Sequence, residues 1–63
     1  MTQKDLLYFE DAIEHEKAMV EICNNFLLKL KNNELKSFVR EQINSHEKIR
    51  DELLYFLKEK ANE

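Results

Sequence analysis

Residues 31–35 read KNNEL, and this stretch is the one place where the chain has an obvious means of reversing its direction. The 63 residues include no glycine and no proline, so the usual turn and helix-breaking residues are missing. Asparagine is the best substitute present, because it tolerates the left-handed conformation that ends many helices and is also a preferred N-cap. We predict that Asn32 ends one helix and that Asn33 caps the next.

Two long helices are predicted on either side of this interruption. Thr2 and Asp5 have the spacing of a capping box, and an apolar pattern of helical period then continues to about Leu30. We expect a single domain over residues 1–63, with helices at about residues 3–31 and 34–60 and a turn at 32–33. So short a turn makes the helices antiparallel neighbours, which gives an all-α helical hairpin.

The composition limits the classes of partner. Charged residues make up 37% of the chain, but both signs are interspersed and the net charge is −3, so no strong field attracts nucleic acid. No apolar run approaches the roughly 20 residues that span a bilayer, and the first residues lack the apolar core of a signal peptide. We therefore expect a cytoplasmic protein with neither nucleic-acid nor membrane partners.

Each predicted helix carries an apolar stripe that is interrupted by polar residues at its middle. When residues are placed at 100° intervals, Glu16 falls at the centre of the first stripe, and Gln42 and His46 fall at the centre of the second. We predict that these three residues form a polar core layer. The apolar residues expected in the core of the assembly are Phe9, Ile13, Val20, Leu27, Leu35, Ile49, Leu53 and Phe56.

A short internal similarity marks the end of the hairpin opposite the turn. The sequence DLLYFE at residues 5–10 is echoed by ELLYFL at 52–57, and an antiparallel hairpin brings the two copies together. Aromatic residues at helical spacing are usually core residues. We expect an aromatic clamp of Phe9, Phe56, Tyr8 and Tyr55 that holds the two ends of the chain together, in preference to the alternative of a ligand pocket.

The hairpin is expected to need a partner. Below about 70–80 residues a single core rarely supplies more than ~3–5 kcal/mol, and the one cysteine, Cys23, cannot form an intrachain disulfide. Further apolar residues lie toward the margins of the stripes: Leu7, Ile22, Leu28, Ile43 and Leu54. We predict a homodimer that forms a four-helix bundle with the turns at opposite ends.

The stretch AIEHEKAMVEICNNFLLKLKNNELKSFVREQINSHEKIRDELLYFL, residues 12–57, resembles half of a rubrerythrin-like, ferritin-like bundle. It is also similar to the hairpins of the spore coat protein F family of spore-forming bacteria. The resemblance rests on Glu16 in the middle of the first helix, NEL at the turn, and His46 in the middle of the second helix. It implies a bacterial protein, with a structural role and a place in the spore coat.

The resemblance to di-iron proteins of the ferritin-like group also bears on chemistry. In those proteins one helix supplies a Glu and the next supplies a Glu-x-x-His motif. Glu16 and His46 match two of these ligands, but Ile43 stands where the second acid is needed. The missing carboxylates argue against oxidase, peroxidase or iron-storage activity, and we predict a non-enzymatic protein without a cofactor.

Three interpretations of the polar layer remain open. The side chains could bond to one another and fix the helix register. Two copies of Glu16 and His46 could instead hold a metal such as zinc across a dimer axis, as in a degenerate ferritin-like protein. Glu16 could also simply reach water. A Rop-type RNA-binding bundle is a further alternative for function, and it would require basic residues along one outer groove.

Overall fold

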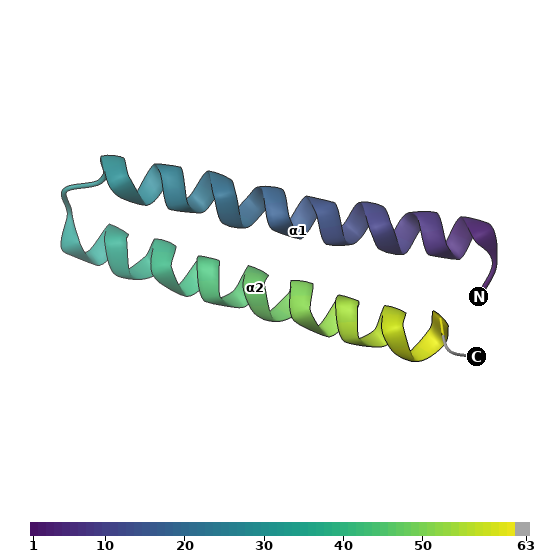
Figure 1. Ribbon diagram of the computed structural model, residues 1–63. Helices are drawn as coiled ribbons and strands as arrows, with labels where there is room; N and C mark the ends of the chain where they lie inside the picture. The colour runs from purple at the N-terminus through teal and green to yellow at the C-terminus, as the bar shows by residue number, and fades with distance from the viewer. Residues whose placement is uncertain (62–63) are drawn as a thin grey trace.

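Two antiparallel α-helices make up the fold. The computed structural model describes residues 1–61, with α1 spanning Gln3–Lys29 and α2 spanning Asn33–Ala61. The helices lie side by side, with the turn at one end and both chain termini at the other, which we call the open end (Figure 1). The molecule measures 47 × 15 × 10 Å, so it is a single layer of two rods. The predicted all-α helical hairpin is confirmed.

The start of α1 carries the capping box that the sequence predicts. The Asp5 backbone N–H donates to the Thr2 hydroxyl oxygen at 3.0 Å, and the Thr2 backbone N–H donates to the Asp5 carboxylate at 3.1 Å. These two bonds satisfy amide groups that have no partner within the helix. The aspartate also places negative charge at the positive end of the helix dipole.

The turn differs in detail from the prediction. Helix α1 ends at Lys29, two residues early, and Leu30 continues with extended backbone at φ −82° and ψ 145°. No described residue has a positive φ, so Asn32 does not end α1 in the left-handed conformation. Asn32 instead caps α2, because its side-chain oxygen accepts a hydrogen bond from the Leu35 backbone N–H at 3.0 Å. The cap therefore falls one residue before the predicted Asn33.

One line of side chains joins the two helices, and we call it the seam. Its members are spaced alternately three and four residues apart, as in a coiled coil. Each of them is buried or half-buried. The seam comprises Phe9, Ile13, Glu16, Val20, Cys23 and Leu27 of α1, and Val39, Ile43, His46, Arg50, Leu53 and Leu57 of α2. Among the described residues only Ile13 and Val39 are buried, at 4% and 6% exposure, so two helices alone do not enclose a core.

The hairpin has two unlike broad faces. Successive side chains along an α-helix point in directions about 100° apart. In two antiparallel helices that face each other, the residues one position before the seam residues therefore lie on the same side of the hairpin. That side, which we call the apolar face, carries Tyr8, Ala12, Met19, Ile22 and Phe26 of α1 and Leu35, Phe38, Ile49 and Phe56 of α2. The same position relative to the seam is taken by four polar residues, His15, Gln42, Ser45 and Glu52. The residues one position after the seam residues lie on the opposite side, which we call the polar face. Its charged residues are Glu10, Glu14, Lys17, Glu21, Arg40, Glu47, Asp51 and Lys58.

The corrected cap yields a test with a matched control. Asn32→Ala removes the acceptor for the Leu35 amide and is expected to cost about 1 kcal/mol of unfolding free energy. For a chain of this size that corresponds to a melting temperature lowered by about 4–8 °C. Asn33→Ala alters a neighbouring exposed asparagine without removing a cap and is expected to change the melting temperature little. Thermal unfolding followed by circular dichroism decides, and a larger loss for Asn33→Ala would restore the original cap assignment.

Candidate functional site

A single polar contact crosses the middle of the seam. The Nδ1 atom of His46 on α2 is hydrogen-bonded to the Oε2 atom of Glu16 on α1. The His46 side chain is 23% exposed and the Glu16 side chain 15%, so both lie mostly out of water. Among the described residues no buried side-chain nitrogen or oxygen lacks a hydrogen-bond partner. The glutamate that interrupts the apolar stripe of α1 therefore has a partner in the facing helix.

The chemistry of the contact fixes the roles of its atoms. When the Glu16 carboxylate is ionised it can only accept, and the Nδ1–H of His46 is then the donor. In the neutral ring this leaves Nε2 as an acceptor, and in the charged ring both nitrogens donate. In either state the bond ties the middle of α1 to the middle of α2, so it favours one helix register over others.

The structure brings together two of the three residues of the predicted polar layer. Gln42 is half-buried, but among the described residues its side chain makes no hydrogen bond to the Glu16–His46 pair. The reason lies in helix geometry, because Gln42 precedes the seam residue Ile43 and so lies on the apolar face. The polar layer in the seam is therefore a pair.

The residues predicted for the core of the assembly fall into two groups. Phe9, Ile13, Val20, Leu27 and Leu53 lie in the seam between the helices of one hairpin. Leu35, Ile49 and Phe56 lie on the apolar face and are 52%, 41% and 48% exposed. The hairpin alone thus leaves the second group open to solvent.

Sequence reasoning misplaced part of the second helix. It put Ile43 at a margin, whereas Ile43 lies in the seam. It also overlooked Arg50, which lies in the seam and donates to the Asp51 carboxylate at 3.1 Å and 3.2 Å. Residues 39, 43, 46, 50, 53 and 57 are spaced alternately four and three apart, and this spacing could have identified the seam of α2. A simple helical wheel at 100° per residue does not show it clearly, because the wheel drifts relative to a 3.5-residue repeat.

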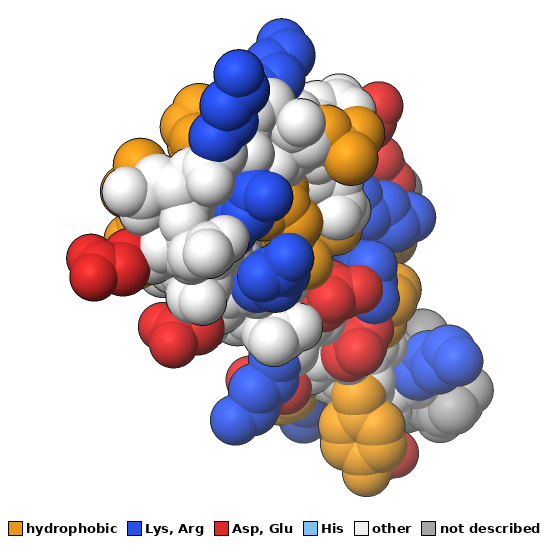
Figure 2. All heavy atoms as spheres, turned by 90° about the vertical axis from the view of Figure 1, so that its left-hand side faces the viewer, with side chains coloured by type: hydrophobic (Ala, Val, Ile, Leu, Met, Phe, Trp, Pro, Cys, Tyr) orange, Lys and Arg blue, Asp and Glu red, His pale blue; other side chains and the backbone are white. Residues whose placement is uncertain are grey.

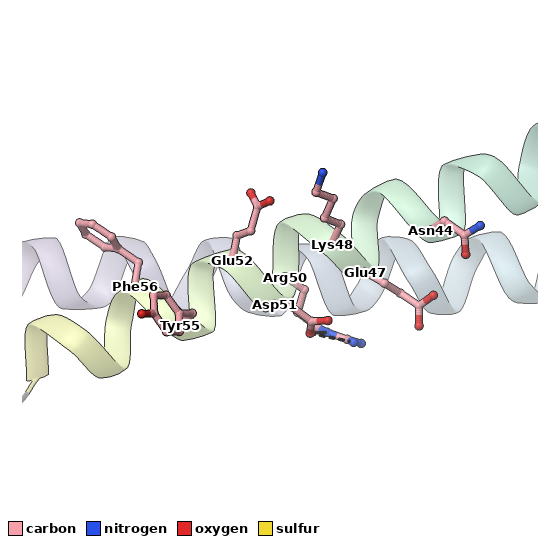
Figure 3. Close-up of a pocket in the computed structure, with 8 residues that line it drawn as sticks. All are labelled: Asn44, Glu47, Lys48, Arg50, Asp51, Glu52, Tyr55 and Phe56. Carbon is pink, nitrogen blue, oxygen red and sulfur yellow. Dashed lines mark hydrogen bonds and ion pairs between the residues drawn. The ribbon is translucent and has the colours of Figure 1, made fainter.

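A hollow in the described part of the chain lies along α2. It has a volume of about 620 Å³ and is lined by eight residues between Asn44 and Phe56. These side chains spring from one helix and point to different sides, with Lys48 and Glu52 directed away from Glu47 and Asp51 (Figure 3). A set that diverges in this way does not hold a reacting atom between a nucleophile and a base.

The metal interpretation can be tested against the described residues. They contain no group of three or more His, Cys, Asp or Glu side chains placed to hold a metal ion. One hairpin thus offers Glu16 and His46 alone, and these two already bond to each other. Zinc sites in proteins use three or four protein ligands, so a zinc site here would have to draw equally on two copies of the chain.

In comparisons with known proteins, no family model, no curated protein and no solved structure matches this chain. The resemblance to ferritin-like and spore coat protein F hairpins therefore stays a prediction. Within the described residues, neither helix has the length and apolar character needed to cross a membrane.

The pair predicts a characteristic pattern of stabilities. His46→Leu leaves the mostly buried Glu16 carboxylate without a hydrogen-bond donor. This variant is expected to lower the unfolding free energy by about 1–3 kcal/mol. Replacing both Glu16 and His46 with leucine also removes the unpaired carboxylate and is expected to recover most of the lost unfolding free energy. Gln42→Leu serves as the control, since it breaks no hydrogen bond. Urea unfolding at fixed protein concentration measures all three variants, and an unchanged His46→Leu protein would show that the contact contributes nothing.

Zinc is expected to leave the melting temperature unchanged, because one hairpin supplies two ligands that already satisfy each other. A metal present at 100 times its dissociation constant would add about 2.7 kcal/mol. In a chain this small that is an increase of more than about 5 °C. An increase of that size, absent in Glu16→Ala, would instead establish the metal site.

Proposed function

We propose that the protein is a non-enzymatic structural or interaction protein that acts as a homodimeric four-helix bundle. The observation that carries the proposal is the apolar face, a broad surface that the hairpin leaves uncovered. The function is then association itself, with the apolar face as the functional surface. The resemblance to spore coat protein F, a family of structural components, agrees with this role.

The exposed area supports association. The chain exposes 5231 Å², whereas a compact monomer of 7.6 kDa is expected to expose about 4,300 Å². The excess of about 900 Å² is close to the roughly 800 Å² that each partner buries in a standard protein–protein interface. One such interface would bring the exposed area of each chain to the value expected of a folded protein.

The kind of side chain exposed supports the same conclusion. Seven of the large hydrophobic residues that remain exposed lie on the apolar face: Tyr8, Ile22, Phe26, Leu35, Phe38, Ile49 and Phe56. Four of these seven are aromatic, the class enriched at the centres of interfaces. Soluble monomers rarely expose contiguous apolar patches larger than a few hundred Å². The face is therefore better suited to burial than to solvent.

A second copy is the simplest occupant. A two-fold dimer pairs the same face with itself, so it covers both exposed surfaces at once and leaves none open for further growth. The charged residues agree, because the polar face, which would remain in water, carries both acidic and basic side chains along its length. That mixture offers no basic groove for RNA, as the Rop-type alternative would require.

The proposal predicts that charge is tolerated on one face and not on the other. Phe38→Glu places a carboxylate on the apolar face and is expected to dissociate the dimer, since burying an unpaired charge costs several kcal/mol. Leu28→Glu is the control, because Leu28 follows a seam residue on the polar side and is 86% exposed. Light scattering should give twice 7.6 kDa for the native chain and for Leu28→Glu. A stable, folded native monomer at 7.6 kDa would overturn the proposal.

A further inference from the structure

The apolar face is hollowed at the open end of the hairpin. A cavity of about 450 Å³ is lined there by Met1, Asp5, Tyr8, Phe9, Phe56 and Lys60. The rings of Phe9 and Phe56 stack with centroids 5.5 Å apart and planes at 18°, as the predicted clamp requires. Tyr8 and Tyr55, which were also predicted for the clamp, are 68% and 67% exposed, so the clamp does not bury them. All six lining residues belong to the seam, to the apolar face, or to the continuation of either at the chain ends, so the cavity opens on that face.

The opposite end of the same face projects large apolar side chains. Ile22 and Phe26 of α1 and Leu35 and Phe38 of α2 lie near the turn and are each between 52% and 58% exposed. We call these four residues the turn-end cluster. One face of the hairpin thus carries an aromatic cavity at one end and protruding apolar side chains at the other.

We propose that the cavity at the open end is a binding site for the turn-end cluster of a second copy. The inference rests on the proposed homodimer and adds the site, its occupant and a physical reason for the predicted orientation with the turns at opposite ends. The cavity volume lies within the roughly 300–1,000 Å³ that is typical of ligand-sized pockets. The cavity has aromatic walls from Tyr8, Phe9 and Phe56, and the Lys60 ammonium lies over the Phe56 ring, 5.5 Å from its centroid. A phenyl ring of Phe26 or Phe38 placed against these walls would be shielded from water.

The spacing of the two features allows both contacts to form together. Along α1, Phe26 lies ten residues after the glutamate of the seam contact, and Asp5 lies eleven residues before it. Along α2, Phe38 lies eight residues before the histidine of that contact, and Phe56 lies ten after it. At 1.5 Å per residue the cluster and the cavity lie about 15 Å on either side of mid-height. A two-fold axis through mid-height, perpendicular to the helices, places each cluster over the other copy's cavity.

The distribution of charge favours the same orientation. The half of the hairpin near the turn, residues 17–46, has five basic and three acidic side chains. The open half, described over residues 1–16 and 47–61, has five basic and nine acidic side chains. Viewed from the turn end, basic side chains lie at the top and centre, with acidic side chains to either side (Figure 2). Turns at opposite ends set positive halves against negative ones, whereas turns at the same end would set like charges together.

Cross-linking between copies reads the orientation directly. In a Cys23→Ala background, copies carrying Tyr8→Cys are mixed with copies carrying Ile22→Cys and treated with a short bismaleimide. A matched mixture combines Phe38→Cys copies with the same Ile22→Cys copies. The three native side chains are 68%, 58% and 58% exposed, so none is needed to hold the hairpin together. Because all three lie in the proposed interface, each mixture is compared only after light scattering shows that it keeps a dimeric mass. The proposal predicts efficient cross-linking of residues 8 and 22, and loss of cross-linking between residues 38 and 22.

The outcomes separate this inference from the proposed function. Cross-linking of residues 38 and 22 in place of 8 and 22, in a protein of dimeric mass, overturns the orientation and leaves the homodimer standing. A monomeric mass overturns both. Phe26→Ala tests the site itself and is expected to weaken self-association about tenfold or more, as truncation of a buried aromatic anchor does. Leu28→Ala is its control, and equal dissociation constants for the two variants would show that the cavity holds no phenylalanine.

Discussion

Two helices meet along only one line, and this constraint shapes the whole molecule. Each helix carries two adjacent apolar stripes, whereas the seam can accommodate one stripe from each. Ile13 and Val39, at 4% and 6% exposure, are therefore the only described side chains that become buried. The second apolar stripes of the two helices lie on the same face of the hairpin, because the helices are antiparallel and pack against each other along the seam. The hairpin is in this sense half of a packed core, and its exposed face is a consequence of its topology.

The polar contact in the seam has a role that apolar residues cannot supply. Leucine, valine and isoleucine pack almost equally well when one helix slides past its partner, so an entirely apolar seam selects its register weakly. The Glu16–His46 bond forms in one register, and every other register leaves a mostly buried carboxylate without a donor. Register then fixes which residues share a level, including the stacked pair Phe9 and Phe56. The contact thereby also positions the cavity at the open end.

The two ends of the hairpin are unlike, and this asymmetry gives the exposed face a direction. A uniform apolar surface would pair with itself in several orientations of similar free energy. A cavity at the open end, a protruding cluster at the turn and opposite charges in the two halves distinguish those orientations. Shape and charge act at different distances here, since surface charges act over about 8 Å at physiological salt and packing acts only on contact. Both favour the arrangement in which unlike ends meet.

The sequence by itself determined the hairpin, because helical periodicity and the single interruption at KNNEL are local properties. The capping box at Thr2 and Asp5 and the meeting of Phe9 with Phe56 also followed, since each depends on spacing along the chain or on simple reversal. The cap at Asn32 was not predictable, because two adjacent asparagines have the same intrinsic preference and the extended Leu30 selects between them. Which stripe entered the seam was likewise decided in three dimensions. A helical wheel shows a broad apolar arc on α2, and only packing against α1 draws Ile43 and Arg50 inward while it leaves Ile49 and Gln42 on the apolar face.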